Sequence, residues 1–168
     1  RQVDHHLARA RAATAIRATG LRTPVLEPLQ ALLRTMRRLH AGREVHFHLA
    51  SDVQQLEPLA FRGEEQDFFE MLGNLLDNAG KWASSRVELS VQALPGPPGQ
   101  GGQLCLLVDD DGPGIPDPAQ RNRIFGRGER LDEQRPGTGL GLDIVRELAH
   151  TYGGSIEAHP SPLGGLQM

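Results

Sequence analysis

The segment EMLGNLLDNAGKW, residues 70–82, lies within a helix that the sequence predicts over residues 64–84. At 3.6 residues per turn, polar residues gather on one side of this helix. They are Glu70, Asn74, Asp77, Asn78 and Lys81, named here the polar stripe. The apolar residues fall on the opposite side: Phe68, Leu72, Leu75, Leu76 and Ala79. The pattern predicts a helix with one face in the core and one face at a site.

The composition of the polar stripe favours binding over simple solvation. Asparagine is a poor residue in the middle of a helix, yet the stripe has two. Lys81 is the only lysine among the 18 basic residues of the chain. A carboxamide oxygen can meet a cation and an amide or ammonium group can meet a phosphate. We therefore expect an anionic, metal-bound ligand at this face.

The rest of the chain is predicted from hydrophobic periodicity and from its glycines and prolines. Helices are expected over residues 1–19, 24–40 and 140–152, and a binding loop or lid over 112–137. Strands are expected over residues 44–50, 58–62, 86–94, 103–108, 155–158 and 166–168. The segment PGPPGQGG, residues 95–102, is predicted to be a hairpin loop. His46 and His48 alternate with apolar residues, which favours the polar face of a strand over a metal site.

Two further motifs carry chemistry. DDDGPGIP, residues 109–116, follows a buried strand, and its glycines allow the backbone to approach a ligand closely. PGTGLGLDIVREL, residues 136–148, leads a glycine-rich segment into a helix. Backbone N–H groups at a helix N-terminus form an anion site. Neither a Walker loop nor a Rossmann fingerprint occurs in the chain.

Composition excludes several classes of protein. The chain has 168 residues, a net charge of −3 and one cysteine. These values argue against a wholly basic nucleic-acid binder, a disulfide framework and a multi-cysteine zinc site. No apolar run approaches the roughly 18 residues that a membrane span needs. We expect no nucleic-acid partner and a reducing compartment.

The motifs together, in this order, resemble the histidine-kinase and Hsp90-like ATPase superfamily. The segment at 70–82 resembles its N box, DDGPGI (110–115) its first glycine box and GTGLGL (137–142) its second. IFGRGER (124–130) resembles the F box of sensor histidine kinases. The resemblance covers residues 44–168. It is closest to PhoQ-type sensor kinases in RPGTGLGL (135–142) and in DHHLARAR (4–11).

The resemblance implies an α/β fold, a two-layer sandwich of the Bergerat type with a mixed β-sheet and helices on one face. It implies that residues 23–168 are a catalytic ATP-binding domain and that residues 1–22 are the tail of a dimerisation and phosphotransfer helix. It also implies ATP and Mg²⁺ as cofactors.

Roles for single residues follow from the matching boxes. Asn74 resembles the magnesium ligand, Asn78 and Lys81 the phosphate contacts, and Asp110 the carboxylate that binds the adenine amino group. Glu70 resembles the N-box acid, a base or an orienter for the attacking imidazole, and Arg130 and Arg127 resemble lid arginines near the γ-phosphate. Glu70, Lys81 and Arg130 are the expected catalytic residues. The remaining expected nucleotide contacts are Trp82, Gly112, Gly114, Ile115, Gly137, Thr138, Gly139, Leu140, Gly141 and Leu142.

Three positions depart from the family pattern. Trp82 stands where Tyr or Phe is usual, and Gly126 replaces a frequent acidic residue. The phosphoacceptor motif is absent, because LRTP at residues 21–24 is preceded by Thr19 where the histidine should stand. The acceptor histidine is therefore expected on a dimerisation domain outside this chain.

The function implied is transfer of the ATP γ-phosphate to that histidine in a two-component phosphorelay. The implied partners are the protein's own dimerisation domain, a response regulator and a second copy in a homodimer. The implied location is cytoplasmic, in a parent protein anchored in the bacterial inner membrane. Two alternatives remain: an ATPase clamp of the gyrase, MutL or Hsp90 type, and a nucleotide-binding module without transfer.

Overall fold

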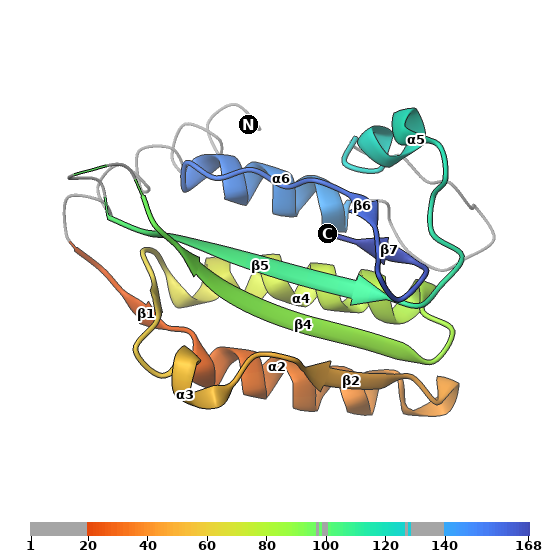
Figure 1. Ribbon diagram of the computed structural model, residues 1–168, viewed down its shortest axis with the longest axis horizontal. Coiled ribbons are helices and arrows are strands. Elements are labelled where there is room, and N and C mark those ends of the chain that lie inside the picture. The colour runs from red at the N-terminus through yellow and green to blue at the C-terminus, as the bar shows by residue number, and fades with distance from the viewer. Residues whose placement is uncertain (1–19, 97, 99–100, 127, 129–139) are drawn as a thin grey trace.

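A five-stranded mixed sheet with helices on one face forms the centre of the molecule (Figure 1). The computed structural model describes residues 20–96, 98, 101–126, 128 and 140–168. The strand order is β2-β4-β5-β7-β6. The bounds are β2 His46–Leu49, β4 Arg86–Leu94, β5 Gln103–Asp110, β6 His159–Pro160 and β7 Leu166–Gln167. The expected sandwich of a mixed sheet and one helical layer is confirmed.

The pairing of the strands makes the sheet mixed. β2 runs parallel to β4, while β4–β5, β5–β7 and β6–β7 are antiparallel. β4 and β5 form the expected hairpin, in which Val87 pairs with Asp110 and Leu94 with Gln103. This register brings the carboxyl end of β5 beside the start of β4. Since β4 follows α4 directly, the end of α4 lies at the same corner of the sheet.

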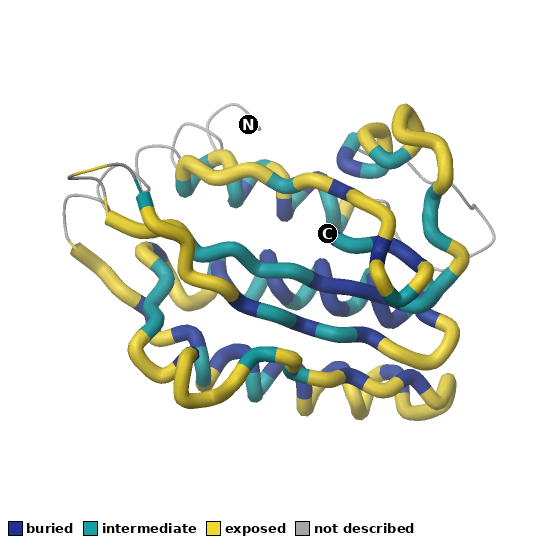
Figure 2. Tube along the Cα trace, in the orientation of Figure 1, coloured by how far each residue is buried: buried dark blue, intermediate teal, exposed yellow. Residues whose placement is uncertain are grey.

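Three helices form the second layer. They are α2 Leu26–Leu39, α4 Glu65–Trp82 and α6 Gly141–Thr151. α4 lies between the other two, packing against α2 on one side and α6 on the other (Figure 1). The expected helix over 64–84 is confirmed, and its apolar face is buried. Buried residues concentrate on α4, in the first part of β4 and at the carboxyl end of β5 (Figure 2).

Smaller elements complete the fold. β1 Thr23–Pro24 pairs antiparallel with β3 Ala60–Phe61 in a separate two-stranded sheet. The short helix α3 Val53–Leu56 and the 3₁₀ turn η1 Ala41–Arg43 flank β2. Sequence periodicity missed α3 because four residues span too little of a helix to show a pattern.

Two expectations need correction. Residues 155–158 do not form the expected strand. The strand that forms is β6, which begins directly after them at His159. The register there is set by pairing with Leu166 and Gln167, which local alternation cannot reveal. The expected loop at 112–137 contains the helix α5 Pro118–Arg123. Asp117 caps it by accepting from the Ala119 N–H at 2.8 Å, and Pro118 begins it.

No helix in the described part of the chain combines the length and the apolar character that a membrane span requires. The expected helix over residues 1–19 lies outside the described residues. The boundary expected near residue 22 therefore stays a prediction.

Candidate functional site

The polar stripe lies along α4 at the edge of the core. Its five members are all partly exposed, while the opposite face of α4 contains the fully buried Phe68, Leu72, Leu76 and Ala79. A ligand can therefore reach the polar stripe while the opposite face of α4 stays buried in the core.

Asn74 connects the stripe to the start of α6. Its Nδ2 donates to the Glu70 carbonyl at 2.8 Å, which fixes the carboxamide orientation because a carbonyl can only accept. The Asn74 Oδ1 then faces Gly141, the first residue of α6: a Cβ at Gly141 would lie 2.9 Å from that oxygen. An amide oxygen is therefore held at a helix N-terminus, where N–H groups have no partner within the helix.

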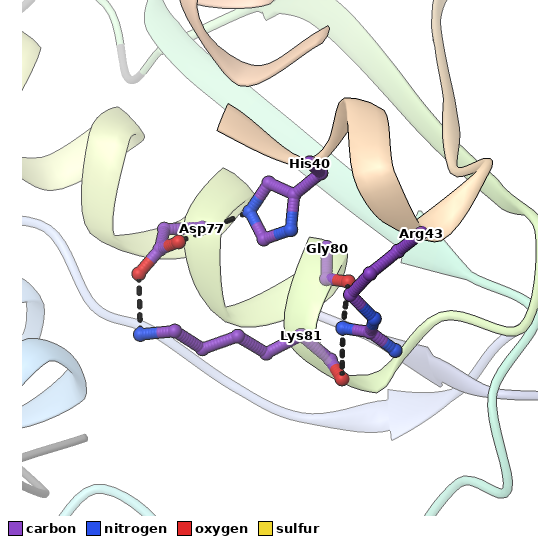
Figure 3. Close-up of polar contacts among 5 residues, drawn as sticks. All are labelled: His40, Arg43, Asp77, Gly80 and Lys81. Carbon is purple, nitrogen blue, oxygen red and sulfur yellow. Dashed lines mark hydrogen bonds and ion pairs between the residues drawn. The ribbon is translucent and has the colours of Figure 1, made fainter. Parts of the chain in front are cut away.

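Lys81 lies in the last turn of α4 and is tied to Asp77. Its Nζ is 2.6 Å from the Asp77 Oδ2, and its side chain is 37% exposed. The other carboxylate oxygen of Asp77 meets the Nε2 of the buried His40 at 3.1 Å (Figure 3). His40 comes from the end of α2, so the stripe is fixed by a neighbouring helix as well as by α4 itself.

Asp110 ends β5 as a buried carboxylate, with 1% of its surface exposed. The N–H groups of Gly112 and Leu166 both donate to Oδ1, at 2.8 and 3.3 Å. Within the described residues, the hydrogen bonds to this carboxylate all go to Oδ1, so Oδ2 is the oxygen left to face a ligand. Burial raises the pKa of Asp110 above its ordinary value, despite the opposing effect of the two N–H donors.

The two neighbouring carboxylates have structural partners. Asp109 accepts from the Ser161 hydroxyl at 2.7 Å and from the Gln167 side-chain amide at 3.0 Å, which ties β5 to the C-terminal hairpin. Asp111 accepts from the backbone N–H groups of Ser84, Ser85 and Arg86 at 2.8 to 2.9 Å. The Ser85 hydroxyl also donates to Asp111, at 2.7 Å. Against the opposing effect of desolvation, this hydroxyl and the three N–H groups together lower the pKa of Asp111 to about 2. Of the three carboxylates, Asp110 is the one suited to a ligand.

The glycines of the first glycine motif allow close backbone approach. A Cβ at Gly112 would collide with the carbonyl oxygen of Trp82, so Gly112 permits the contact between β5 and the end of α4. Gly114 has a φ of 65°, and a Cβ there would lie 3.0 Å from the Gly165 carbonyl oxygen. Ile115 packs against the core, and its carbonyl accepts from Arg121 at 2.6 Å.

The second glycine motif is described only from Leu140 onward. Leu140 occupies the N-cap of α6 and Leu142 packs against the core. Arg127, Arg130, Gly137, Thr138 and Gly139 lie outside the described residues. Their expected roles stay predictions.

Sequence reasoning missed His40, Arg43 and Gly165. Arg43 donates to the carbonyls of Gly80 and Lys81, at 2.8 and 2.7 Å. It thereby gives hydrogen-bond partners to carbonyl groups in the last turn of α4. Gly165 gives its N–H to the Asp110 carbonyl at 3.1 Å, and a Cβ there would collide with the Asp110 carboxylate. The Gly164-Gly165 pair is a sequence signal for a close backbone approach. His40 and Arg43 have no such signal, because their partners are about 37 residues away.

The described residues hold no cluster of three or more His, Cys, Asp or Glu side chains that could bind a metal ion. Magnesium needs fewer protein ligands than this, because it keeps several waters and is shared with phosphates. The Asn74 Oδ1 is a hard oxygen donor of the kind that Mg²⁺ takes. The site therefore fits a magnesium ion that arrives with a polyphosphate.

Comparison with known proteins identifies the family. Residues 63–168 match the family described as "Histidine kinase-, DNA gyrase B-, and HSP90-like ATPase". The chain belongs to this ATPase family. The match includes α4, the Asp110 motif and α6, which are the elements that form the site. ATP is thus the ligand that the family implies.

The relatives include sensor kinases. The chain is 46% identical over 143 residues to the sensor protein kinase CarS of Pseudomonas aeruginosa, covering 84% of this chain and 29% of CarS. It is 38% identical over 145 residues to the sensor protein PhoQ of Escherichia coli, covering 86% of this chain and 28% of PhoQ. The expected likeness to PhoQ-type kinases is confirmed. The chain spans less than a third of the length of either relative.

The fold is also found in solved structures. A mycobacterial sensor histidine kinase, MprB, superposes with a TM-score of 0.68 at 26% identity, over 88% of this chain and 93% of that one. The ATP binding domain of PrrB from Mycobacterium tuberculosis gives a TM-score of 0.65 at 22% identity, over 88% of this chain and 91% of that one. The second similarity supports the fold alone.

Proposed function

We propose that this chain is the ATP-binding kinase domain of a sensor histidine kinase, and that it binds ATP with Mg²⁺ between α4, α6 and the end of β5. The observation that carries the proposal is the convergence of a buried carboxylate, Asp110, and a polar helix face on one corner of the sheet. In this proposal, residues 23–168 are the catalytic domain and residues 1–22 belong to the preceding helix.

Asp110 is proposed to recognise adenine. An ionised carboxylate accepts from the exocyclic amine of adenine and repels the O6 acceptor that guanine has at the corresponding place. Both backbone donors hold Oδ1, and Oδ2 is the oxygen proposed to accept from the adenine amine. Trp82, next to the Gly112 turn, is proposed to pack near the base as a flat ring.

The polar stripe and the start of α6 are proposed to bind the phosphates. Asn78 and Lys81 supply an amide and a positive charge, and N–H groups at the start of α6 add a favourable dipole for an anion. Asn74 is the proposed magnesium ligand, and when bound the ion offsets charge that develops on the phosphates during transfer. Lys81, with Arg130 and Arg127, would hold the γ-phosphate in line for attack.

Glu70 is the proposed base or orienter of the attacking imidazole, since it shares the stripe with Asn74 and Lys81. The acceptor histidine is proposed to lie on a dimerisation domain of the parent protein, with a response regulator as the next acceptor. We propose a homodimeric parent anchored in the bacterial inner membrane with this domain in the cytoplasm. The named kinases CarS and PhoQ support this assignment.

Isothermal titration of this chain with a non-hydrolysable ATP analogue tests the proposal. We expect binding that strengthens when Mg²⁺ is added and that exceeds binding of the matched GTP analogue. Equal affinity for the two nucleotides would contradict adenine recognition. No binding in either condition would contradict the proposed site as a whole.

A further inference from the structure

A short connector joins the end of α2 to the last turn of α4. His40 and Arg43 both come from this connector, which comprises residues 40–43 and includes η1. Arg43 donates to the backbone carbonyls of Gly80 and Lys81. His40 reaches the Asp77 side chain, one helical turn earlier (Figure 3). The connector therefore contacts both the backbone of Lys81 and the side chain that pairs with it.

The His40 contact requires a glycine in α4. Gly80 is buried in the helix, and a Cβ there would lie 2.7 Å from the Phe47 ring and 2.8 Å from the His40 Nε2. Glycine inside a helix is unfavourable relative to alanine. Its presence at this position gives His40 and Phe47 the space to pack against α4, with ring centroids 5.6 Å apart.

The direction of the contact follows from the chemistry of its partners. A carboxylate can only accept, so the Nε2 of His40 carries the proton and donates to the Asp77 Oδ1. The other oxygen, Oδ2, pairs with the Lys81 Nζ. His40 is 6% exposed and packed on Phe47, whereas Lys81 is 37% exposed at the stripe. A buried residue is thus linked through one carboxylate to a partly exposed cation.

We propose that His40, acting through Asp77, is a positioning residue that holds the Lys81 ammonium ready for the nucleotide phosphates. The inference rests on the proposed phosphate role of Lys81. Lysine loses much rotamer freedom when it is immobilised, so a side chain that is already oriented loses less on binding. His40 also keeps Asp77 hydrogen-bonded when Lys81 turns toward a phosphate, so the carboxylate never lacks a partner.

A double-mutant cycle with ADP tests this inference. His40→Leu removes the donor and fills the same space with an apolar side chain. We expect this variant to bind ADP more weakly, by about threefold or more. His40→Gln can place an amide N–H near the Nε2 position, and we expect it to restore most of the affinity. In a Lys81→Ala background, His40→Leu should have no further effect. His46→Leu, a matched change on the exposed face of strand β2, should leave ADP binding unchanged.

Adenosine separates positioning from simple damage to the fold. It lacks phosphates, so His40→Leu should bind adenosine as well as the unmodified chain does. An equal loss for adenosine and ADP would make His40 merely structural and would overturn the inference. Additive losses in the Lys81→Ala background would overturn it as well. If Lys81→Ala itself leaves ADP binding unchanged, the proposed phosphate role of Lys81 is wrong instead.

If His40→Leu does not fold, Asp77→Asn can take its place in the ADP and adenosine titrations. Asp77 is partly exposed, and its amide analogue has the same shape, so this variant should fold. We expect this variant to bind ADP more weakly and adenosine normally. Tighter ADP binding would mean that Asp77 competes with the phosphates for Lys81, and the inference would be overturned.

Discussion

Asp109, Asp110 and Asp111 are chemically identical neighbours with three different surroundings. Asp109 holds the C-terminal hairpin, Asp111 holds the turn after α4, and Asp110 is buried with its bonds on one oxygen. Desolvation raises the pKa of Asp110, while hydrogen bonds lower that of Asp111. The role of each carboxylate is therefore decided by its partners, and each can be tested by one substitution.

Asp110→Asn should weaken ATP binding by about tenfold or more, because one charge-assisted hydrogen bond in a buried pocket contributes about 1.5–3 kcal/mol. The preference for ATP over GTP should shrink as well. Titration calorimetry with both nucleotides measures these changes. Unchanged ATP affinity in a folded variant would remove Asp110 from adenine recognition.

The raised pKa of Asp110 also has a consequence for stability. In the unfolded chain, the Asp110 carboxyl is ionised once the pH exceeds its ordinary pKa of 3.8. In the folded chain, the same carboxyl keeps its proton to a higher pH. Stability from this group is thus present at low pH and is lost as the pH rises through the folded pKa. We expect Asp110→Asn to be at least as stable as the unmodified chain at neutral pH, as measured by urea unfolding. A clear destabilisation there would mean that the charge itself supports the fold.

Asn74→Ala and Lys81→Ala should impair nucleotide binding in different ways. Loss of the carboxamide oxygen should remove the magnesium dependence of ATP binding, because Mg²⁺ takes few protein ligands. Loss of the lysine charge should weaken ATP and ADP with or without Mg²⁺. Titrations in magnesium and in chelator separate the two, with thermal melts as a control for folding. A folded Asn74→Ala variant with a full magnesium response would contradict the metal assignment.

Among the elements, α4 combines a buried apolar face with a partly exposed polar one, and its C-terminal end is held from two sides. Arg43 binds its last carbonyls, and Asp111 accepts from the N–H groups that follow. This places Trp82 and Lys81 at the corner where β5 ends. The turn after α4 therefore helps to position the end of the polar stripe.

Asp111→Asn should destabilise the fold at neutral pH by about 1 kcal/mol, since an amide replaces charge-assisted bonds in a partly exposed turn. The folded pKa of about 2 lies below the ordinary value of 3.8, so the stabilisation is present above 3.8 and is lost as the pH falls toward 2. Urea unfolding at a series of pH values should show a shallower acid loss in the variant. Parallel acid profiles for the two proteins would contradict this role.

At the scale of the whole molecule, the site joins parts of the chain that are far apart in sequence. α4 lies between α2 and α6, and the C-terminal hairpin donates an N–H from Leu166 to Asp110, 56 residues earlier. A ligand that contacts these parts together stabilises the folded chain but not the unfolded one. Nucleotide binding should therefore be visible in global stability.

ATP with Mg²⁺ at one hundred times its dissociation constant should add about 2.7 kcal/mol to the stability of the folded chain. For a domain of this size we expect the melting temperature to rise by about 5–10 °C. GTP at the same concentration should give a smaller rise, and differential scanning fluorimetry measures both. An equal rise with the two nucleotides would argue against base selection.

This chain should also remain unlabelled when it is incubated with γ-labelled ATP and Mg²⁺. The sequence has no family-like phosphoacceptor motif, because Thr19 stands where the histidine is expected. Gel analysis after acid and base treatment is the measurement. Label that is acid-labile and base-stable would identify a phosphohistidine on this chain and contradict the prediction.

Features that depend on local order could be predicted from the amino-acid sequence alone. The two faces of α4, the β4–β5 hairpin and the order of the motifs follow from periodicity, turn residues and spacing along the chain. These properties rest on interactions between near neighbours, so they are visible without a structure.

The partners that meet across the chain became visible once the fold was known. It distinguished Asp110 from Asp109 and Asp111, moved the predicted strand at 155–158 to β6, and brought His40 to Asp77. Each of these outcomes depends on contacts between residues tens of positions apart, or on strand register. Such contacts are set by the packing of α2 against α4 and by the placement of the C-terminal hairpin beside β5. The residues that make them have no local pattern that would reveal their partners.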